Sequence, residues 1–231
     1  MPTPAPVVIE SPFCALVPCS TTLIESEYSG NGQIRAADAA RRRPGQHSDG
    51  SRRAGNDATH RAETPATTWV GVSGSWRYAP PGLRDAVQRE VAAVLAAGKS
   101  IVTGGALGVD YWATQTALNI DPQRLKVILP TSLATYSAHC RRRAAEGVIS
   151  AQQAEDLISQ LEAVSHAGSL IEHPDRQQVV DVTTYYLRNQ DVVDVASELL
   201  AFQVNASSGT QDTVNKARLK GIPVTVFTYQ S

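Results

Sequence analysis

The sequence predicts an α/β protein with a doubly wound, mostly parallel sheet, a Rossmann-like three-layer αβα fold. From residue 68 onward, short apolar runs such as 68–74 and 100–105 alternate with segments of helical periodicity. Both of these runs end in glycine, as expected where a parallel strand turns into a crossover helix. The residues before 68 lack the alternation, so we expect a single Rossmann-like domain over 68–231.

The first half of this domain is expected to run strand, helix, strand, helix, strand. Apolar residues at three- and four-residue steps over 83–95 indicate a helix, which Gly98 ends. A second helix is expected over 108–119. The apolar run 124–130 is a third strand, because its last residue is a proline that cannot continue a ladder.

Two polar-rich helical stretches, 137–147 and 150–165, come next, with Ser150 as the expected N-cap of the second. A strand-like run, SLIEH (169–173), follows them. The whole region of about 133–175 is longer than a minimal Rossmann connection. We expect a helical insertion here that acts as a lid or as a dimer surface.

The last part of the domain is expected to contain two more helices and two strands. Residues 176–197 look helical, and their expected inward-facing residues are Val179, Val182, Tyr186 and Val193. ELLAFQVN (198–205) is a strand, the helix after it is closed by Gly221, and 222–229 forms the final strand.

Residues 1–67 are expected to form a disordered or loosely packed extension. Within them, 28–67 contains one isoleucine and no leucine or valine, so it cannot bury enough apolar surface to offset the entropy of ordering. The arginines at 41–43 and 52–53 could contact phosphates, although a solvated linker is the preferred interpretation. The more apolar 7–24 could add an edge strand.

Composition limits the function classes. The net charge is −1, so a surface for nucleic acid must be a local patch. The three cysteines (Cys14, Cys19 and Cys140) form no CxxC pair, which favours free thiols over disulfides or structural zinc. No apolar run reaches about 18 residues, so we expect a cytoplasmic protein without a membrane span. We expect no cofactor and no metal site.

Ligand binding is expected at the carboxyl edge of the sheet, where right-handed crossovers bring the strand-to-helix turns together. The candidate ligand-binding residues are Gly74, Ser75, Arg77, Gly104, Gly105, Gly108, Asp110, Arg188, Asn189, Ser207, Ser208, Gly209 and Thr210. Small residues and hydroxyls at helix N-termini suit phosphate groups, which arginines would neutralise. An equal alternative for the glycines is that they only permit tight turns.

The turn 104–110 (GGALGVD) has neither the G-x-G-x-x-G spacing of dinucleotide-binding proteins nor a P-loop. An anion at the N-terminus of its helix is still reasonable. Asp110 either favours the helix dipole or holds a ribose hydroxyl.

The succession VGVSGSWR, IVTGGALGVDYWATQTAL, RNQ and SSGT, followed by GIPVTVF, resembles the SLOG superfamily of Rossmann-like proteins over about 68–229. That superfamily includes the Smf/DprA DNA-processing proteins and the "lonely guy" (LOG) phosphoribohydrolases, and the resemblance is greatest to the DprA-like branch. It implies that the matching residues line one polar pocket for a nucleotide or for the phosphates of single-stranded DNA.

Two departures from these families bear on catalysis. The helix after Asp110 lacks the histidine usual in DprA-like proteins. In the LOG signature a glutamate assists N-glycosidic cleavage, but Thr213 occupies that position here and Asp212 lies one residue early, turned by about 100 degrees on a helix. The catalytic residues are therefore unknown, and Asp110 and Asp212 are the only candidates.

Other side chains near the expected crevice have mainly structural interpretations. His139 and Cys140 are adjacent on a helix, so they point apart and do not form a nucleophile–base pair. Arg141–Arg143 could bind phosphates, but a solvated helix end is the commoner case. Aromatic residues that could stack on a base, or simply belong to the core, are Trp76, Tyr78, Tyr111, Trp112 and Tyr136.

The sequence thus supports three hypotheses. The first is a DprA-like module that binds a nucleotide or single-stranded DNA. The second is an enzyme that cleaves the N-glycosidic bond of a nucleotide, and the third is a sensor of a signalling nucleotide. We expect a homodimer or a higher homo-oligomer.

Overall fold

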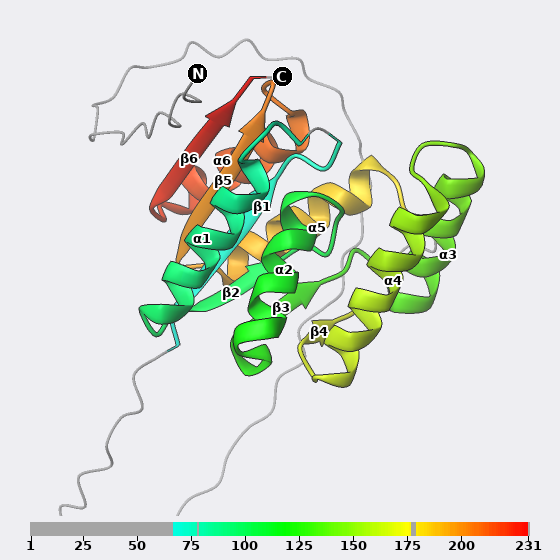
Figure 1. The fold of residues 1–231 in the computed structure, drawn as a ribbon, viewed down its shortest axis with the longest axis horizontal. Coiled ribbons are helices and arrows are strands. Elements are labelled where there is room, and N and C mark those ends of the chain that lie inside the picture. Colours follow the sequence, from blue (N-terminus) through cyan, green and yellow to red (C-terminus); the bar gives the residue numbers. More distant parts are fainter. Residues whose placement is uncertain (1–66, 78, 177–178, 231) are drawn as a thin grey trace, which may run out of the picture. The chain divides into compact units, whose positions relative to one another are not determined.

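The structure, a computed structural model, describes residues 67–77, 79–176 and 179–230. Its strands are β1 (Trp69–Gly74), β2 (Ser100–Thr103), β3 (Leu125–Ile128), β4 (Leu170–Ile171), β5 (Glu198–Val204) and β6 (Val224–Tyr229). Its helices are α1 (Leu83–Ala96), α2 (Val109–Ile120), the 3₁₀ turn η1 (Pro122–Arg124), α3 (Leu133–Ala145), α4 (Ala151–His166), α5 (Val182–Val195) and α6 (Ser208–Lys220). The expected alternation of strands and helices is confirmed (Figure 1).

All six strands pair in parallel, in the order β4–β3–β2–β1–β5–β6. β1 is central: Val70 lies opposite Ile101 of β2 on one side and Glu198 of β5 on the other. The chain builds the sheet outward from β1 to β4 and then returns to the other side of β1. This reversal is the topological switch point of a doubly wound sheet.

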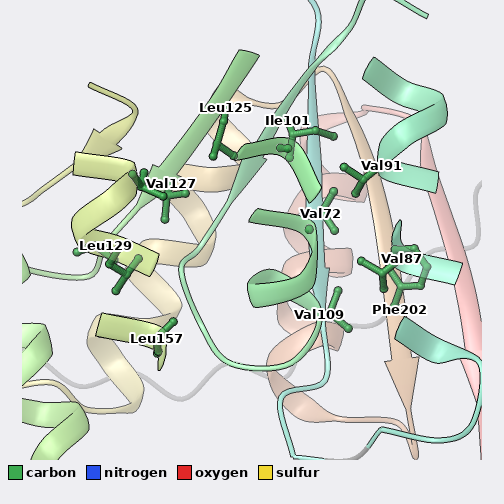
Figure 2. Close-up of a cluster of buried hydrophobic side chains, with 14 of the residues drawn as sticks. Val72, Val87, Val91, Ile101, Val109, Leu125, Val127, Leu129, Leu157 and Phe202 are labelled. Carbon is green, nitrogen blue, oxygen red and sulfur yellow. The ribbon is translucent and has the colours of Figure 1, made fainter. Parts of the chain in front are cut away.

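Helices cover both faces of the sheet. Figure 1 shows α1 and α2 on one face and α5 and α6 on the other. On the first face, Val72, Ile101 and Phe202 point toward Val87 and Val91 of α1 (Figure 2). On the opposite face, Leu199 and Ala201 of β5, which alternate with Leu200 and Phe202 of the first core, belong to a second core. The other buried members of this second core come from α5 and α6: Val193, Val214 and Ala217.

The region 133–175 contains α3, α4 and β4. α3 begins four residues earlier than expected, because Ser132 accepts a hydrogen bond from the amide of Thr135 at 3.2 Å and so caps the helix. The expected cap Ser150 is confirmed, with a reciprocal capping box to Gln153. Leu157 of α4 joins the main core (Figure 2).

The expected inward face of the helix before β5 is wrong for three of its four residues. Val193 is buried, but Val179, Val182 and Tyr186 are 60%, 63% and 38% exposed. α5 begins only at Val182, after its N-cap Asp181. Its inward side is instead partly polar; the buried residues are Thr184, Arg188, Asn189, Val192 and Val193.

None of the helices within the described ranges is both long and apolar enough to cross a bilayer. The expectations for the 1–67 extension fall, apart from residue 67, on residues outside those described, as do the expectations for its arginines, for its apolar stretch and for Tyr78.

Candidate functional site

The turns after β1 and β5 meet at the carboxyl edge, at the switch point of the sheet. The Ser75 hydroxyl accepts a hydrogen bond from the amide of Val204 at 3.0 Å and donates one to the Ser207 hydroxyl at 3.0 Å. The Ser207 hydroxyl in turn donates to Thr210 Oγ1 at 2.7 Å. Three of the predicted ligand-binding residues are therefore brought together, but as a hydroxyl chain that joins two turns.

A pocket of about 500 Å³ opens at the same edge. Its lining comes from the turns after β1 and β2, from α3 and α4 with their connection, and from the first turns of α5 and α6. The lining residues are Trp76, Ala106, Leu107, Tyr136, His139, Cys140, Arg143, Val148, Ile149, Leu157, Val180, Asp181, Val182, Tyr185, Tyr186, Ser208 and Gly209. Most of them are apolar or aromatic, as is usual for a site that holds a ring.

The first turn of α6 forms one side of the pocket, through Ser208 and Gly209. Both residues are exposed, and a Cβ added at Gly209 would meet no atom within 4 Å. The N-cap Ser207 makes no side-chain hydrogen bond to the amides of this turn. The turn therefore presents amides without a side-chain cap, together with the positive end of the helix dipole.

Trp76 lies on another side of the pocket and is 40% exposed. The guanidinium carbon of Arg77 is 4.6 Å from the centre of the Trp76 ring, a cation–π arrangement. Arg77, a predicted phosphate ligand, is itself exposed. It lies against Trp76, which lines the pocket.

Arg188, Gly104 and Asp110 bind one another beneath the turn after β2. The Arg188 guanidinium donates to the carbonyl of Gly104, and its Nη1 lies 3.4 Å from Asp110 Oδ2. The Gly104 amide donates to the same carboxylate oxygen at 3.1 Å. Arg188 and Asp110 are buried, and neither lines the pocket. Their predicted contacts with phosphate and ribose stay predictions.

Burial dominates the electrostatics of this buried pair. It raises the pKa of Asp110, whereas the charge of Arg188 and the amides of Ala106 and Gly104 lower that pKa. The Arg188 side chain also keeps one buried nitrogen, Nε, without a hydrogen-bond partner. Arg188 thus connects α5 to the turn after β2 inside the protein.

The glycines of the β1 and β2 turns each have a packing reason. A Cβ at Gly104 would collide with the Arg188 guanidinium, and one at Gly74 would lie 2.5 Å from Val109. A Cβ added at Gly105 would lie 2.9 Å from side-chain atoms of both Val127 and Leu129. Gly108 has a φ of +71° and lies against the Ser75 carbonyl, so only glycine fits. Contact with a ligand stays a prediction for all four.

Asn189 and Asp212 also pair with each other. Asn189 Nδ2 donates to Asp212 Oδ2 at 3.0 Å, and Lys216 Nζ donates to the same oxygen at 2.6 Å. Both carboxylates considered for catalysis, Asp110 and Asp212, are thus engaged with a cation and an N–H donor.

Cys140 has no nucleophile–base geometry with His139, as expected. Burial raises the pKa of its thiol to about 11, and the His139 ring bonds to Arg142 and Tyr185 instead. The neighbouring Arg141–Arg143 are each paired with a glutamate: Arg141 with Glu155, and the other two with Glu146.

Of the remaining aromatic candidates, Tyr136 lines the pocket, whereas Tyr111 and Trp112 pack against the main core. Among the described residues, no group of three or more His, Cys, Asp or Glu side chains is placed to hold a metal ion.

The sequence reasoning missed the wall formed by the start of α5, which includes Asp181 and Tyr185. The capping box of Asp181 and Thr184 was the available signal. It marks the first turn of the helix, and hence the residues that face the carboxyl edge.

A family model described as DNA recombination-mediator protein A matches residues 60–230. No curated protein sequence matches the chain. Among solved structures, DNA processing protein A from Helicobacter pylori aligns at 18% identity with a TM-score of 0.52, covering 68% of this chain and 63% of that one. The chain thus spans just under two thirds of that protein's length.

Two further structures align less well. The molybdenum cofactor binding protein from Rippkaea orientalis gives 18% identity and a TM-score of 0.46, over 72% of this chain and 79% of that one. DNA processing protein A from Streptococcus pneumoniae gives 17% identity and a TM-score of 0.38, over 68% and 58%. The SLOG-type resemblance and the Rossmann-like fold are confirmed, and because the family model matches well over half of the sequence, the chain belongs to the DNA recombination-mediator protein A family.

Proposed function

We propose that the carboxyl edge of this sheet binds single-stranded DNA. Its phosphates would be held by the first turn of α6 and by Arg77, and one base would rest on Trp76. The observation that carries the proposal is that a single pocket is lined both by Trp76, against whose ring Arg77 lies, and by the first turn of α6.

The first turn of α6 has the features of an anion site. Its amides have no side-chain cap, the Ser207 hydroxyl is committed to Thr210, and Gly209 leaves open space in front of the backbone. A phosphate oxygen there would accept hydrogen bonds from the free N–H groups, and its negative charge would interact favourably with the helix dipole.

Trp76 adds a surface for a base. Aromatic side chains bind single strands by stacking on bases, and an arginine beside them contacts the backbone. Membership of the family supports this ligand, and the Helicobacter pylori relative is described for its unique single-stranded DNA binding mode.

The structure gives less support to a phosphoribohydrolase. Asp212 is held by Lys216 and Asn189, and Asp110 is buried against Arg188. A general acid–base group must reach the substrate, whereas each of these carboxylates is occupied by internal partners. We therefore propose binding without N-glycosidic cleavage.

The sharpest test places a charge in front of the α6 turn. Gly209→Asp would put a carboxylate where the phosphate is proposed to lie, and Gly209→Asn would add nearly the same shape without the charge. We expect Gly209→Asp to weaken binding of a labelled oligothymidylate about tenfold more than Gly209→Asn does, measured by fluorescence anisotropy, and to leave thermal stability unchanged or slightly raised.

Arg218→Gln serves as a control, because Arg218 is exposed in the last turn of α6, at the far end of that helix. Equal binding by the two Gly209 variants would contradict the proposal. Competition by a mononucleotide at similar concentration would show that the site takes a nucleotide and not a strand. The expected homo-oligomer and the cytoplasmic location stay predictions, and light scattering tests the first of them.

A further inference from the structure

His139 lies in the wall of the pocket, between α3 and α5. Its ring stacks on that of Tyr136, with centroids 6.3 Å apart and planes inclined by 7°. It also meets the Tyr185 ring edge-on at 6.2 Å. Contacts on two sides hold the imidazole in a defined orientation at the surface of the pocket.

The hydrogen bonds of the ring define its protonation state. Arg142 Nη2 lies 2.8 Å from His139 Nδ1, and a guanidinium can only donate, so Nδ1 accepts and carries no proton. The single proton of a neutral imidazole is then on Nε2, which donates to Tyr185 Oη at 3.1 Å. Protonation of Nδ1 would therefore remove the acceptor that Arg142 uses.

The charged groups around the ring come from two helices. On α3, Arg142 and Arg143 stand near it, and Glu146 pairs with both arginines. Burial and the two arginines lower the pKa of His139 below its ordinary value, and Glu146 opposes them only in part.

On α5, the Asp181 carboxylate lines the same pocket and accepts a hydrogen bond from the amide of Thr184. The guanidinium carbon of Arg188 lies 5.6 Å from the centre of the Tyr185 ring, which His139 also contacts. The first turn of α6 contributes Ser208 and Gly209, which carry no side-chain charge. The free pocket thus disfavours a positive charge on the ring, beside the charges of Arg142 and Arg143.

We propose that His139 is a proton-linked phosphate ligand: when protonated it releases Arg142, and the two cations together bind one phosphate group of the DNA. The inference rests on the proposed function, because only an anion in the pocket makes the additional positive charge favourable. The complex then holds a proton that the free protein does not. By linkage, the affinity for DNA rises as the pH falls toward and below neutrality.

Oligothymidylate is the suitable probe, because its bases do not titrate near neutral pH. We expect the wild-type protein to bind it several-fold more tightly at about pH 5.5 than at about pH 8, since one proton and a shift of about one pKa unit limit the ratio to about tenfold. His139→Gln keeps an acceptor for Arg142 but cannot gain a proton, so its affinity should be flat with pH. His166→Gln, an exposed histidine outside the pocket lining, should keep the wild-type dependence.

Calorimetry in two buffers of different ionisation enthalpy gives a second readout, with proton uptake on binding by the wild type and none by His139→Gln. The imidazole ¹⁵N signals of the wild type, titrated with and without the oligonucleotide, make the same test without a substitution. DNA binding with an unchanged His139 midpoint, or with the same pH dependence in His139→Gln, would overturn this inference alone. Absence of binding at every pH would overturn the proposed function as well.

Discussion

At the scale of single residues, Arg188 and Asp110 form a buried ion pair that also binds the backbone of Gly104. Removing one member of such a pair leaves the other charge buried without compensation, which costs far more than the net stabilisation by the intact pair. The turn after β2 therefore depends on a side chain from α5, 78 residues further along the chain from Asp110.

We predict that Arg188→Met lowers the free energy of unfolding by about 3 kcal/mol near pH 7.5, and that adding Asp110→Asn restores part of the loss. Burial raises the folded-state pKa of Asp110, and without Arg188 this pKa rises further. The folded variant then binds a proton more readily than its unfolded chain does. Its deficit against the double variant should therefore shrink as the pH falls from about 7.5 to about 5.

Urea denaturation of both variants at several pH values measures this difference. A single variant as stable as the double variant at about pH 7.5 would show that the carboxylate is not buried in the way described.

The sequence placed several residues at the sheet edge where the pocket lies, but it did not predict their arrangement. Ser208, Gly209 and Trp76 line the pocket. Their positions at this edge could be predicted because strand ends and helix starts can be located from local patterns. Arg188 could not be assigned in the same way. Whether an arginine on a helix faces solvent or a buried carboxylate depends on a contact between segments distant in sequence, and a local pattern contains no such information.

At the scale of secondary structure, the strands were the most predictable elements, since an apolar run marks each of the main ones and glycine or proline bounds β1, β2, β3 and β6. α5 was the least predictable. Its apolar residues Val182 and Tyr186 lie on the exposed, pocket-bordering side, while Thr184 and Asn189 are buried. Hydrophobic periodicity fails here, because the helix covers the polar turns of the sheet edge as well as the apolar sheet face.

The C-terminus of α5 is closed by a side chain from α6. Lys220 Nζ donates to the carbonyl oxygens of Val193, Asp194 and Ala196, each at 2.8 Å. These carbonyls lie at the end of the helix, where a cation also interacts well with the dipole.

We predict that Lys220→Met destabilises the domain by about 1 kcal/mol and increases amide hydrogen exchange near the end of α5. Arg218→Met, on the same exposed turn of α6, is the matched control and should have a much smaller effect. An equal loss of stability in the two variants, measured by thermal unfolding, would mean that the hydrogen bonds from Lys220 to the three carbonyls do not stabilise the domain.

At the scale of the whole molecule, the net charge of −1 provides no long-range attraction for a polyanion. Many of the described cations are paired with carboxylates, including Arg141–Arg143 beside the pocket. DNA binding would then depend on a few contacts at one edge, through Arg77, the α6 turn and the His139–Arg142 pair.

We predict a shallow salt dependence for the oligothymidylate. Two to three phosphate contacts correspond to a slope of roughly −1.5 to −2 in a plot of log affinity against log salt concentration, since each contact with a single strand contributes about −0.7. Anisotropy titrations at several salt concentrations give this slope. A value several times steeper would indicate a much larger basic surface than the pocket edge.

The central place of β1 has a consequence for how the domain is assembled. β1 ends at Gly74, and its partner β5 begins only at Glu198, so the two halves of the switch point are separated by more than half the chain. Contacts of such sequence separation form late and slow folding, and chains emerge from the ribosome N-terminus first. A nascent chain would already have β1 to β4 available while one side of β1 was still unpaired. The DNA site that we propose could therefore form only after β5 and the start of α6 have been synthesised.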